Sequence, residues 1–152
     1  MAPNYSLYTI PLYWILALIP HAYAIGLIKK SNNNNFNNAN PHSLTTTAEY
    51  QKTVPAKVFA RYERAEAAHH NAMENAPFFV GAVVLGNWVG LEHGTMNFAT
   101  GAVLLLRLVY TLLYIRIEKT QFSHARSAVW AAGVGVLMGL YIKAGNVVVG
   151  RG

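Results

Sequence analysis

The sequence contains no cysteine, and only 12% of its 152 residues are charged. Without a thiol the chain can form no disulfide framework and offers no cysteine nucleophile, so any catalytic sulfur has to come from a substrate. The charged fraction is about half that of an ordinary soluble protein, whereas 53% of the residues are hydrophobic. Together with a mean hydropathy of +0.23, this balance is typical of a small membrane protein, and the length fits one domain.

Acidic residues are also scarce, since six Asp and Glu stand against twelve Lys and Arg and give a formal net charge of +6. In a membrane protein, the first use of such basic residues is to set orientation and to contact anionic lipid headgroups. We therefore expect membrane lipids as partners and no nucleic acid.

Four apolar stretches are each about long enough for a helix to cross roughly 30 Å of hydrocarbon. We expect an all-α, four-helix membrane bundle that occupies residues 1–152 as a single domain. The spans are expected at about 5–28, 57–91, 96–117 and 125–149. Aromatic residues early in the first span are typical of an interfacial belt (Tyr5, Tyr8, Tyr13 and Trp14). Glycines in the fourth span should allow close approach to a neighbouring helix (Gly133, Gly135 and Gly139).

The stretch 31–53, between the first two spans, is expected to be an irregular loop. Its centre, NNNNFNNAN, is of low complexity and can bury too little apolar surface to become ordered by itself. We interpret it as an insertion in a surface loop, because lengthening such a loop costs little free energy.

Basic residues lie mainly at the span ends that face the first and third loops. They are Lys29, Lys30, Lys52, Lys57, Arg116, Lys119 and Arg126, whereas the opposite side carries Arg151, with Lys143 nearby in the last span. The positive-inside rule therefore predicts that the loop 31–53 is cytosolic and that both chain termini lie on the other side. The start of the second span and the end of the third should then lie at the same depth.

Polar residues in the second and third spans indicate a functional site. Arg64, Asn71 and Glu74 share one face of the second helix, and Arg107, Tyr110 and Tyr114 share one face of the third. Arg107 lies near the middle of its span, where an arginine costs about 2.5–3.5 kcal/mol and needs compensation.

Glu74 is an obvious partner for Arg107, since the helix directions bring the two residues to comparable depth. The pair could be purely structural and fix the second helix against the third. We favour a ligand pocket, because there are more polar groups than one ion pair needs. A guanidinium suits a carboxylate and Glu74 suits an ammonium group, so the ligand would be a zwitterion such as an amino acid or a peptide.

Three further groups of polar residues lie near this site. Arg126 and Ser127, at the start of the fourth span, could belong to the pocket, or Arg126 could extend to the membrane interface. His69, His70 and Glu74 lack a further His or Cys at ligand spacing, so the sequence predicts no metal site. His69 and His70 are expected to form hydrogen bonds at the interface, and His21 is expected to face protein or headgroups.

The sequence resembles the MAPEG superfamily of eicosanoid and glutathione metabolism in three features. These are the four spans, the block HHNAMENAPFF on the second span, and Arg107-Leu-Val-Tyr110 followed by Tyr114 on the third. The resemblance implies a homotrimer in the endoplasmic reticulum membrane, with glutathione as co-substrate between neighbouring subunits. It assigns Asn71, Glu74, Arg107, Tyr110 and Tyr114 to glutathione binding, with Glu74 on the γ-glutamyl amino group. The best match to the arginine that stabilises the glutathione thiolate is Arg126.

Two positions depart from the family pattern. Glutathione-using relatives usually carry Arg four residues before the motif Asn, where this chain has Ala67, and Arg64, one turn away, could substitute for it. His42, after Asn40-Pro41, stands where the family often has Arg. The five-lipoxygenase-activating protein, a lipid-binding partner without transferase activity, also lacks the first of these arginines.

Three functions are therefore compatible with the sequence. The first is a glutathione S-transferase, with or without peroxidase activity, that acts on lipophilic electrophiles or lipid hydroperoxides. The second is a non-catalytic lipid-binding protein that resembles the five-lipoxygenase-activating protein. The third is a structural membrane protein whose polar stripes only hold its helices together.

Overall fold

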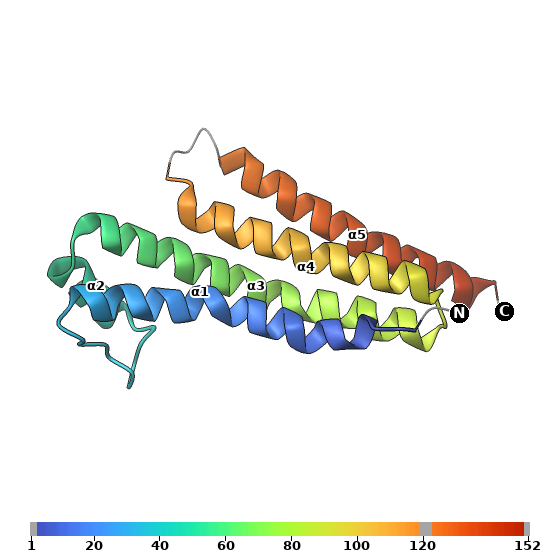
Figure 1. Cartoon of the computed structure of the whole chain (residues 1–152), viewed down its shortest axis with the longest axis horizontal. Coiled ribbons are helices and arrows are strands. Elements are labelled where there is room, and N and C mark those ends of the chain that lie inside the picture. Colours follow the sequence, from blue (N-terminus) through green and yellow to red (C-terminus); the bar gives the residue numbers. More distant parts are fainter. Residues whose placement is uncertain (1–2, 119–122, 151–152) are drawn as a thin grey trace.

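The computed structural model describes residues 3–118 and 123–150, and every regular element in this part of the chain is helical. A 3-10 turn, η1, leads into four long helices that run side by side, while a short helix, α2, lies at one end of the bundle (Figure 1). The elements are η1 (Ser6–Tyr8), α1 (Thr9–Ser31), α2 (Leu44–Thr53), α3 (Ala56–Trp88), α4 (His93–Arg116) and α5 (Ser123–Val149). The all-α prediction is confirmed for the described residues. Lys119 and Arg151, which entered the charge argument, lie outside them.

Three helical segments are long and apolar enough to cross a membrane: Ser6–Ser31, His93–Arg116 and His124–Val149. They coincide with the first, third and fourth expected spans. The helix α3 does not meet the same criterion, because its first half is rich in charged residues and its apolar run begins only at Phe78. The second expected span therefore stays a prediction.

The expectation of an irregular loop through Thr53 is wrong, because α2 occupies its last part. Ser43 caps this helix, since its Oγ accepts a hydrogen bond from the backbone N–H of Thr46 at 3.0 Å. Tyr50 of α2 is 2% exposed, and its hydroxyl accepts the backbone N–H of Asn37 at 2.7 Å. Tertiary hydrogen bonds thus hold part of the Asn-rich stretch, which low complexity alone does not reveal.

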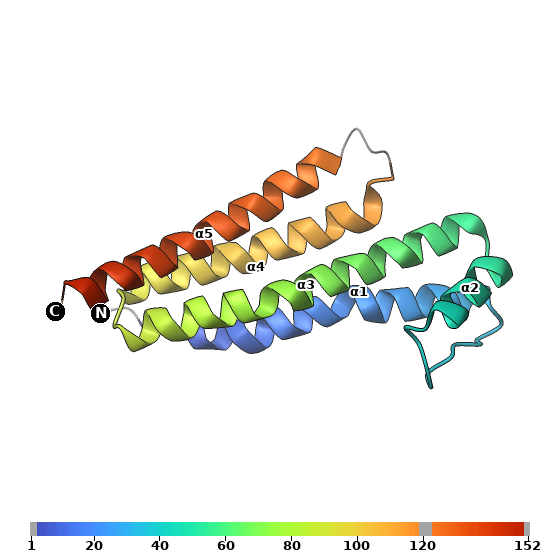
Figure 2. The same cartoon turned by 180° about the vertical axis from the view of Figure 1, so that it is seen from behind.

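The helix α3 is central, since it packs against α1, α4 and α5 (Figure 2). Its contact face toward α1 consists largely of alanines at helical spacing, and small side chains let two helix backbones approach closely. Ala65, Ala68 and Ala72 are fully buried, as are Ala17 and Ala24 of α1. The sequence of α3 therefore specifies a tightly packed helix pair, and this pair positions the polar side chains on the other faces of α3.

Close helix approach does not occur at the glycines of α5. A Cβ atom built at Gly133, Gly135 or Gly139 meets nothing within 4 Å, so the expectation of close packing there is wrong within this chain. The tight positions lie on α3 instead, where a Cβ at Gly86 would come within 2.6 Å of the sulfur of Met96. A second tightly packed glycine of α3 is Gly81, which lies beside the hydroxyl of Tyr141.

Candidate functional site

Arg107 and Asn71 form the centre of the candidate site. Arg107 of α4 donates from Nη1 to Oδ1 of Asn71 on α3 at 2.7 Å. The guanidinium carbon also lies 5.6 Å from the ring centroid of Tyr13 and 5.3 Å from that of Tyr110. An amide acceptor and two aromatic faces stabilise a cation in an apolar setting, so they compensate in part for placing an arginine there.

A second arginine lies next to this cluster. The guanidinium carbon of Arg126, at the start of α5, lies 4.1 Å from the ring centroid of Tyr114. The Tyr114 ring in turn lies 5.4 Å from the ring of Tyr110, one turn earlier on α4. This stacking holds the Arg126 side chain over α4, so it does not extend away from the bundle.

These side chains line one polar pocket of about 250 Å³ between α3, α4 and α5. Its wall consists of Asn71, Tyr110, Tyr114, Arg126, Ser127 and Trp130. Arg107 is not a wall residue, but it lies next to the pocket and is hydrogen-bonded to Asn71, which is one. Five of the residues that the sequence assigned to glutathione therefore converge, and the pocket offers cationic, phenolic and amide groups to a polar ligand.

Glu74 and Arg64 do not join this pocket. Glu74 is exposed, and Arg107 bonds instead to Asn71, which precedes Glu74 by almost one helical turn. The Glu74–Arg107 ion pair considered from the sequence is therefore not formed within this chain. Arg64 donates from Nε to the carbonyl of Ile115 and from Nη2 to Glu118, both at 3.1 Å. Sequence spacing placed these two residues on one face with Asn71, but their tertiary surroundings differ.

Three residues in or near the site were not predicted: Trp130 lines the polar pocket, and Asn75 and Tyr13 lie beside Arg107. Trp130 follows Arg126 by four residues and Asn75 follows Asn71 by four, so helical spacing could have suggested both. Tyr13 was expected in the interfacial belt, but it is only 2% exposed. Its hydroxyl donates to the carbonyl of Ala72 at 2.8 Å. No local signal separates Tyr13 from the other aromatic residues at the start of α1.

Two hollows adjoin the arginine cluster. A narrow cavity of about 20 Å³ lies beside Arg107, Tyr13 and Asn75, and it is large enough for a water molecule but not for a substrate. An apolar groove of about 710 Å³, which Tyr13 also lines, runs between α1 and α3 and includes Ile10, Trp14 and Val80. The narrow cavity beside Arg107 and the apolar groove therefore share one buried tyrosine.

The histidines form a separate cluster around Glu66. Nδ1 of His21 lies 2.8 Å from Oε1 of Glu66, so His21 faces protein as expected. Nδ1 of His69 donates to the carbonyl of Ala17 at 2.8 Å, which agrees with its expected hydrogen-bonding role. His70 faces Glu66 and His42, from the loop before α2, and not Glu74. The ligand set considered from the sequence is therefore not the one that the fold assembles.

The helices and the pocket define an integral membrane protein with an arginine-containing polar site among its helices. The model of the MAPEG family matches residues 7–146, almost the whole chain, and the chain belongs to this family. The family includes glutathione transferases, peroxidases and proteins like the five-lipoxygenase-activating protein. Comparisons with individual curated proteins and with solved structures gave no match.

Proposed function

We propose that the chain is a microsomal-type glutathione transferase, which conjugates glutathione to lipophilic electrophiles or reduces lipid hydroperoxides. One observation carries this proposal: the polar pocket between α3, α4 and α5 combines Asn71, Tyr110, Tyr114 and Arg126, with Arg107 bonded to Asn71. Glutathione has two carboxylates, an ammonium group and a thiol, and these arginine, phenol and amide groups complement such a ligand.

The two arginines have different roles in this proposal. Arg107, oriented by Asn71, binds a glutathione carboxylate with the N–H groups of its guanidinium fork. Arg126, held over the ring of Tyr114, lies beside the glutathione sulfur and stabilises the thiolate. The thiolate is the nucleophilic form of a thiol, and a nearby cation lowers the thiol pKa.

We further propose a homotrimer in the endoplasmic reticulum membrane, in which α3 also crosses the bilayer and a neighbouring subunit completes the site. Two observations support assembly. Glu74, proposed to hold the glutathione ammonium group, is exposed in the single chain. The space around the glycines of α5 is also open, because a Cβ atom built at them meets no other atom within 4 Å. A helix of a neighbouring subunit could therefore pack closely against α5.

The lipophilic substrate would approach through the apolar groove between α1 and α3. This groove of about 710 Å³ has an almost wholly apolar wall and includes Tyr13, whose ring also faces the Arg107 guanidinium. A hydrophobic molecule dissolved in the bilayer would therefore reach Tyr13, beside the guanidinium of Arg107, without crossing water.

A non-catalytic lipid-binding protein is the second candidate, and two residues favour it. Ala67 stands where glutathione-using relatives usually have Arg, and Arg64, which could substitute, is engaged with Glu118. The Arg64–Glu118 pair is partly exposed, so separating it would cost no more than about 1 kcal/mol. The same apolar groove would then hold the lipid.

Glutathione binding separates the two candidates. The full chain, purified in detergent, is heated with and without millimolar glutathione, and conjugation of an activated chloronitrobenzene is measured on the same samples. A ligand present at about 100 times its Kd adds about 2.7 kcal/mol to the free energy of unfolding, which gives a clear thermal shift. Arg107→Ala should abolish this shift, and Arg116→Ala serves as the matched control, because Arg116 is an exposed arginine of the same helix outside the pocket.

Absence of a glutathione-dependent shift in the unaltered chain would exclude the transferase and leave the lipid-binding function. A shift that Arg107→Ala and Arg116→Ala reduce equally would show that glutathione binds elsewhere. Light scattering of the detergent-solubilised protein tests the homotrimer separately, since a monomer with full activity would contradict a site shared between subunits.

A further inference from the structure

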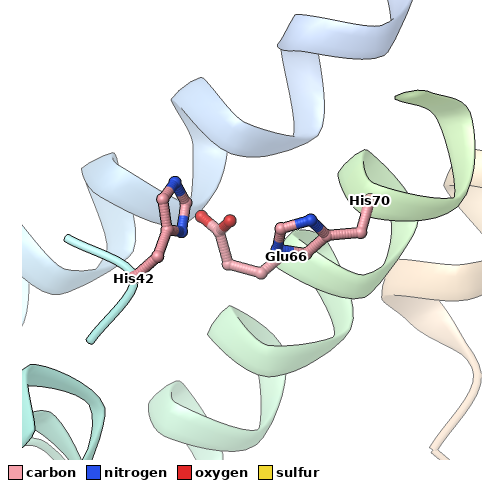
Figure 3. Close-up of side chains that lie close together, drawn as sticks. All are labelled: His42, Glu66 and His70. Atoms are coloured by element: carbon pink, nitrogen blue, oxygen red, sulfur yellow. The ribbon is translucent and has the colours of Figure 1, made fainter. Parts of the chain in front are cut away.

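A second site lies where the loop before α2 meets α3. His42 of the loop, together with Glu66 and His70 one turn apart on α3, brings one nitrogen or oxygen each to within 4.8 Å of one another. In Figure 3 the Glu66 carboxylate points toward the ring of His42, and the ring of His70 lies on its other side. Three side chains from two separate parts of the chain thus converge on one point.

Glu66 is the least exposed member, with 9% of its surface accessible. Its Oε1 lies 2.8 Å from Nδ1 of His21, whereas Oε2 is buried and has no hydrogen-bond partner among the described residues. A buried polar oxygen without a partner costs about 1–3 kcal/mol, and more when it is charged. The contact with His21 therefore satisfies only one oxygen of Glu66, and the other has no hydrogen-bond partner among the described residues.

We propose that His42, Glu66 and His70 bind a divalent transition-metal ion, and we consider Zn²⁺ as the example. Two imidazoles and one carboxylate are a known zinc ligand set, in which the fourth position stays open to water. With Zn–N distances of about 2.0–2.1 Å, tetrahedral donors lie about 3.4 Å apart, so the donors, now within 4.8 Å of one another, need to close by no more than about 1.4 Å. His42 and His70 are exposed, so their rings can turn toward Glu66 without displacing the helical core.

The surroundings of the cluster suit a cation with an open coordination position. The three residues line an open pocket of about 300 Å³ that also includes the carboxylate of Glu63 and the small side chain of Ala67. Water and an exchangeable anion can therefore reach the metal. A carboxylate close to the ligands also favours a divalent ion by direct Coulomb attraction.

A hydrogen-bonded outer layer holds the carboxylate ligand in place. His21 contacts Glu66 and stacks on His69 with ring centroids 4.9 Å apart, while His69 is itself bonded to the carbonyl of Ala17. Metal-binding carboxylates and histidines are commonly oriented by such second partners. The proposed metal would join the loop before α2 to α3, and its site is separate from the arginine pocket.

Zinc binding by the full chain tests this proposal. The protein is purified in detergent, its affinity tag is removed, it is treated with a chelator, and Zn²⁺ is titrated against a chromophoric competitor. We expect one Zn²⁺ per chain, a rise in thermal stability, and visible Co²⁺ bands typical of four-coordinate geometry. His42→Ala and Glu66→Gln should each abolish these signals, whereas His124→Ala, an exposed histidine of α5, is the matched control and should leave them unchanged.

Replacement of His21, which contacts Glu66, should have an intermediate effect in the same experiment. Loss of a partner that orients a ligand lowers metal affinity about 10–100-fold, so His21→Ala should weaken Zn²⁺ binding by that factor and keep one ion per chain. His42 lies on an exposed loop, so its removal leaves the helical core intact. No Zn²⁺ binding by the unaltered chain, or binding that survives both His42→Ala and Glu66→Gln, would overturn the proposal.

Discussion

Replacement of Arg126 by alanine tests the chemical step separately from glutathione binding. Arg126 is half-buried and lies with its guanidinium carbon 4.1 Å from the ring centroid of Tyr114. A thiolate in contact with this guanidinium would lie about 4 Å from a full positive charge, where attraction amounts to about 4 kcal/mol at an effective dielectric constant near 20. Partial exposure of Arg126 reduces this value, and we expect about 1–2 kcal/mol.

That free energy corresponds to roughly one pKa unit of the bound glutathione thiol, since one unit equals about 1.4 kcal/mol. The cation stabilises the charged form and so lowers the thiol pKa, and its removal raises the pKa toward the value of about 8.5 for a free thiol. Near neutral pH, Arg126→Ala should therefore lower the thiolate fraction and kcat about tenfold. Activity should recover as pH rises, because the thiol then ionises without help.

The assay combines ultraviolet absorbance of the bound thiolate with rates of conjugation, both recorded across pH. Arg126→Lys keeps the charge but loses the planar stacking on Tyr114, so it should give an intermediate value. Arg116→Ala, at the end of α4, controls for the loss of a basic side chain at the same end of the helix bundle. If Arg126→Ala leaves both the thiolate absorbance and the pH profile unchanged, Arg126 does not stabilise the thiolate and its assignment is refuted.

Five other substitutions test separate parts of the structure. Tyr13→Phe removes a buried hydroxyl that is bonded to a backbone carbonyl of α3, and should lower the free energy of unfolding by about 0.5–1.5 kcal/mol in chemical denaturation. Gly86→Ala forces a methyl group against a methionine of α4 and should destabilise by about 1–3 kcal/mol, whereas Gly135→Ala, with open space around it, should be tolerated. Glu74→Gln should weaken glutathione binding about tenfold without changing stability, because the carboxylate is exposed and a charged hydrogen bond contributes about 1.5–3 kcal/mol; unchanged affinity in calorimetry would remove it from the site. Ala67→Arg should weaken Zn²⁺ binding by repulsion, and equal affinity in the chelator competition would contradict a cation beside it.

Much of the arginine pocket could be predicted because it depends on local helix geometry. Tyr110 and Tyr114 follow Arg107 by three and seven residues, so an α-helix places all three on one face whatever surrounds it. The charge of Arg107 inside an apolar run then indicates a site, since burial of an arginine requires compensation. The actual acceptor, Asn71 instead of Glu74, could not be predicted, because rotation and sliding of α3 against α4 decide between residues one turn apart.

The features that sequence reasoning missed depend on contacts between distant segments. The buried side of the helix α2 consists of Thr46 and Tyr50 alone, which is too weak a pattern to predict from the sequence. Tyr50 is buried where it bonds to Asn37 of the preceding loop, a contact that the sequence does not reveal. His42 in the same loop has no spacing relation to Glu66, and only the return of the chain along α3 brings the two together. The periodicity of polar and apolar residues describes one helix at a time and cannot predict such tertiary contacts.

Two pockets lie at different levels along α3, and Ala67 belongs to the one that the histidines line. Asn71 faces α4 and the arginine pocket, whereas Ala67, one turn earlier, lines the pocket formed with His42, Glu66 and His70. An arginine at position 67 would place a permanent cation among two imidazoles and the carboxylate that has an unpaired oxygen. It would neutralise Glu66 and repel any metal ion, so an arginine and a metal would compete for the same carboxylate. An alanine leaves this carboxylate available to the proposed metal ion, while Asn71, one turn further along α3, bonds to Arg107 at the arginine pocket. An arginine at position 67 and the proposed metal site would therefore exclude each other.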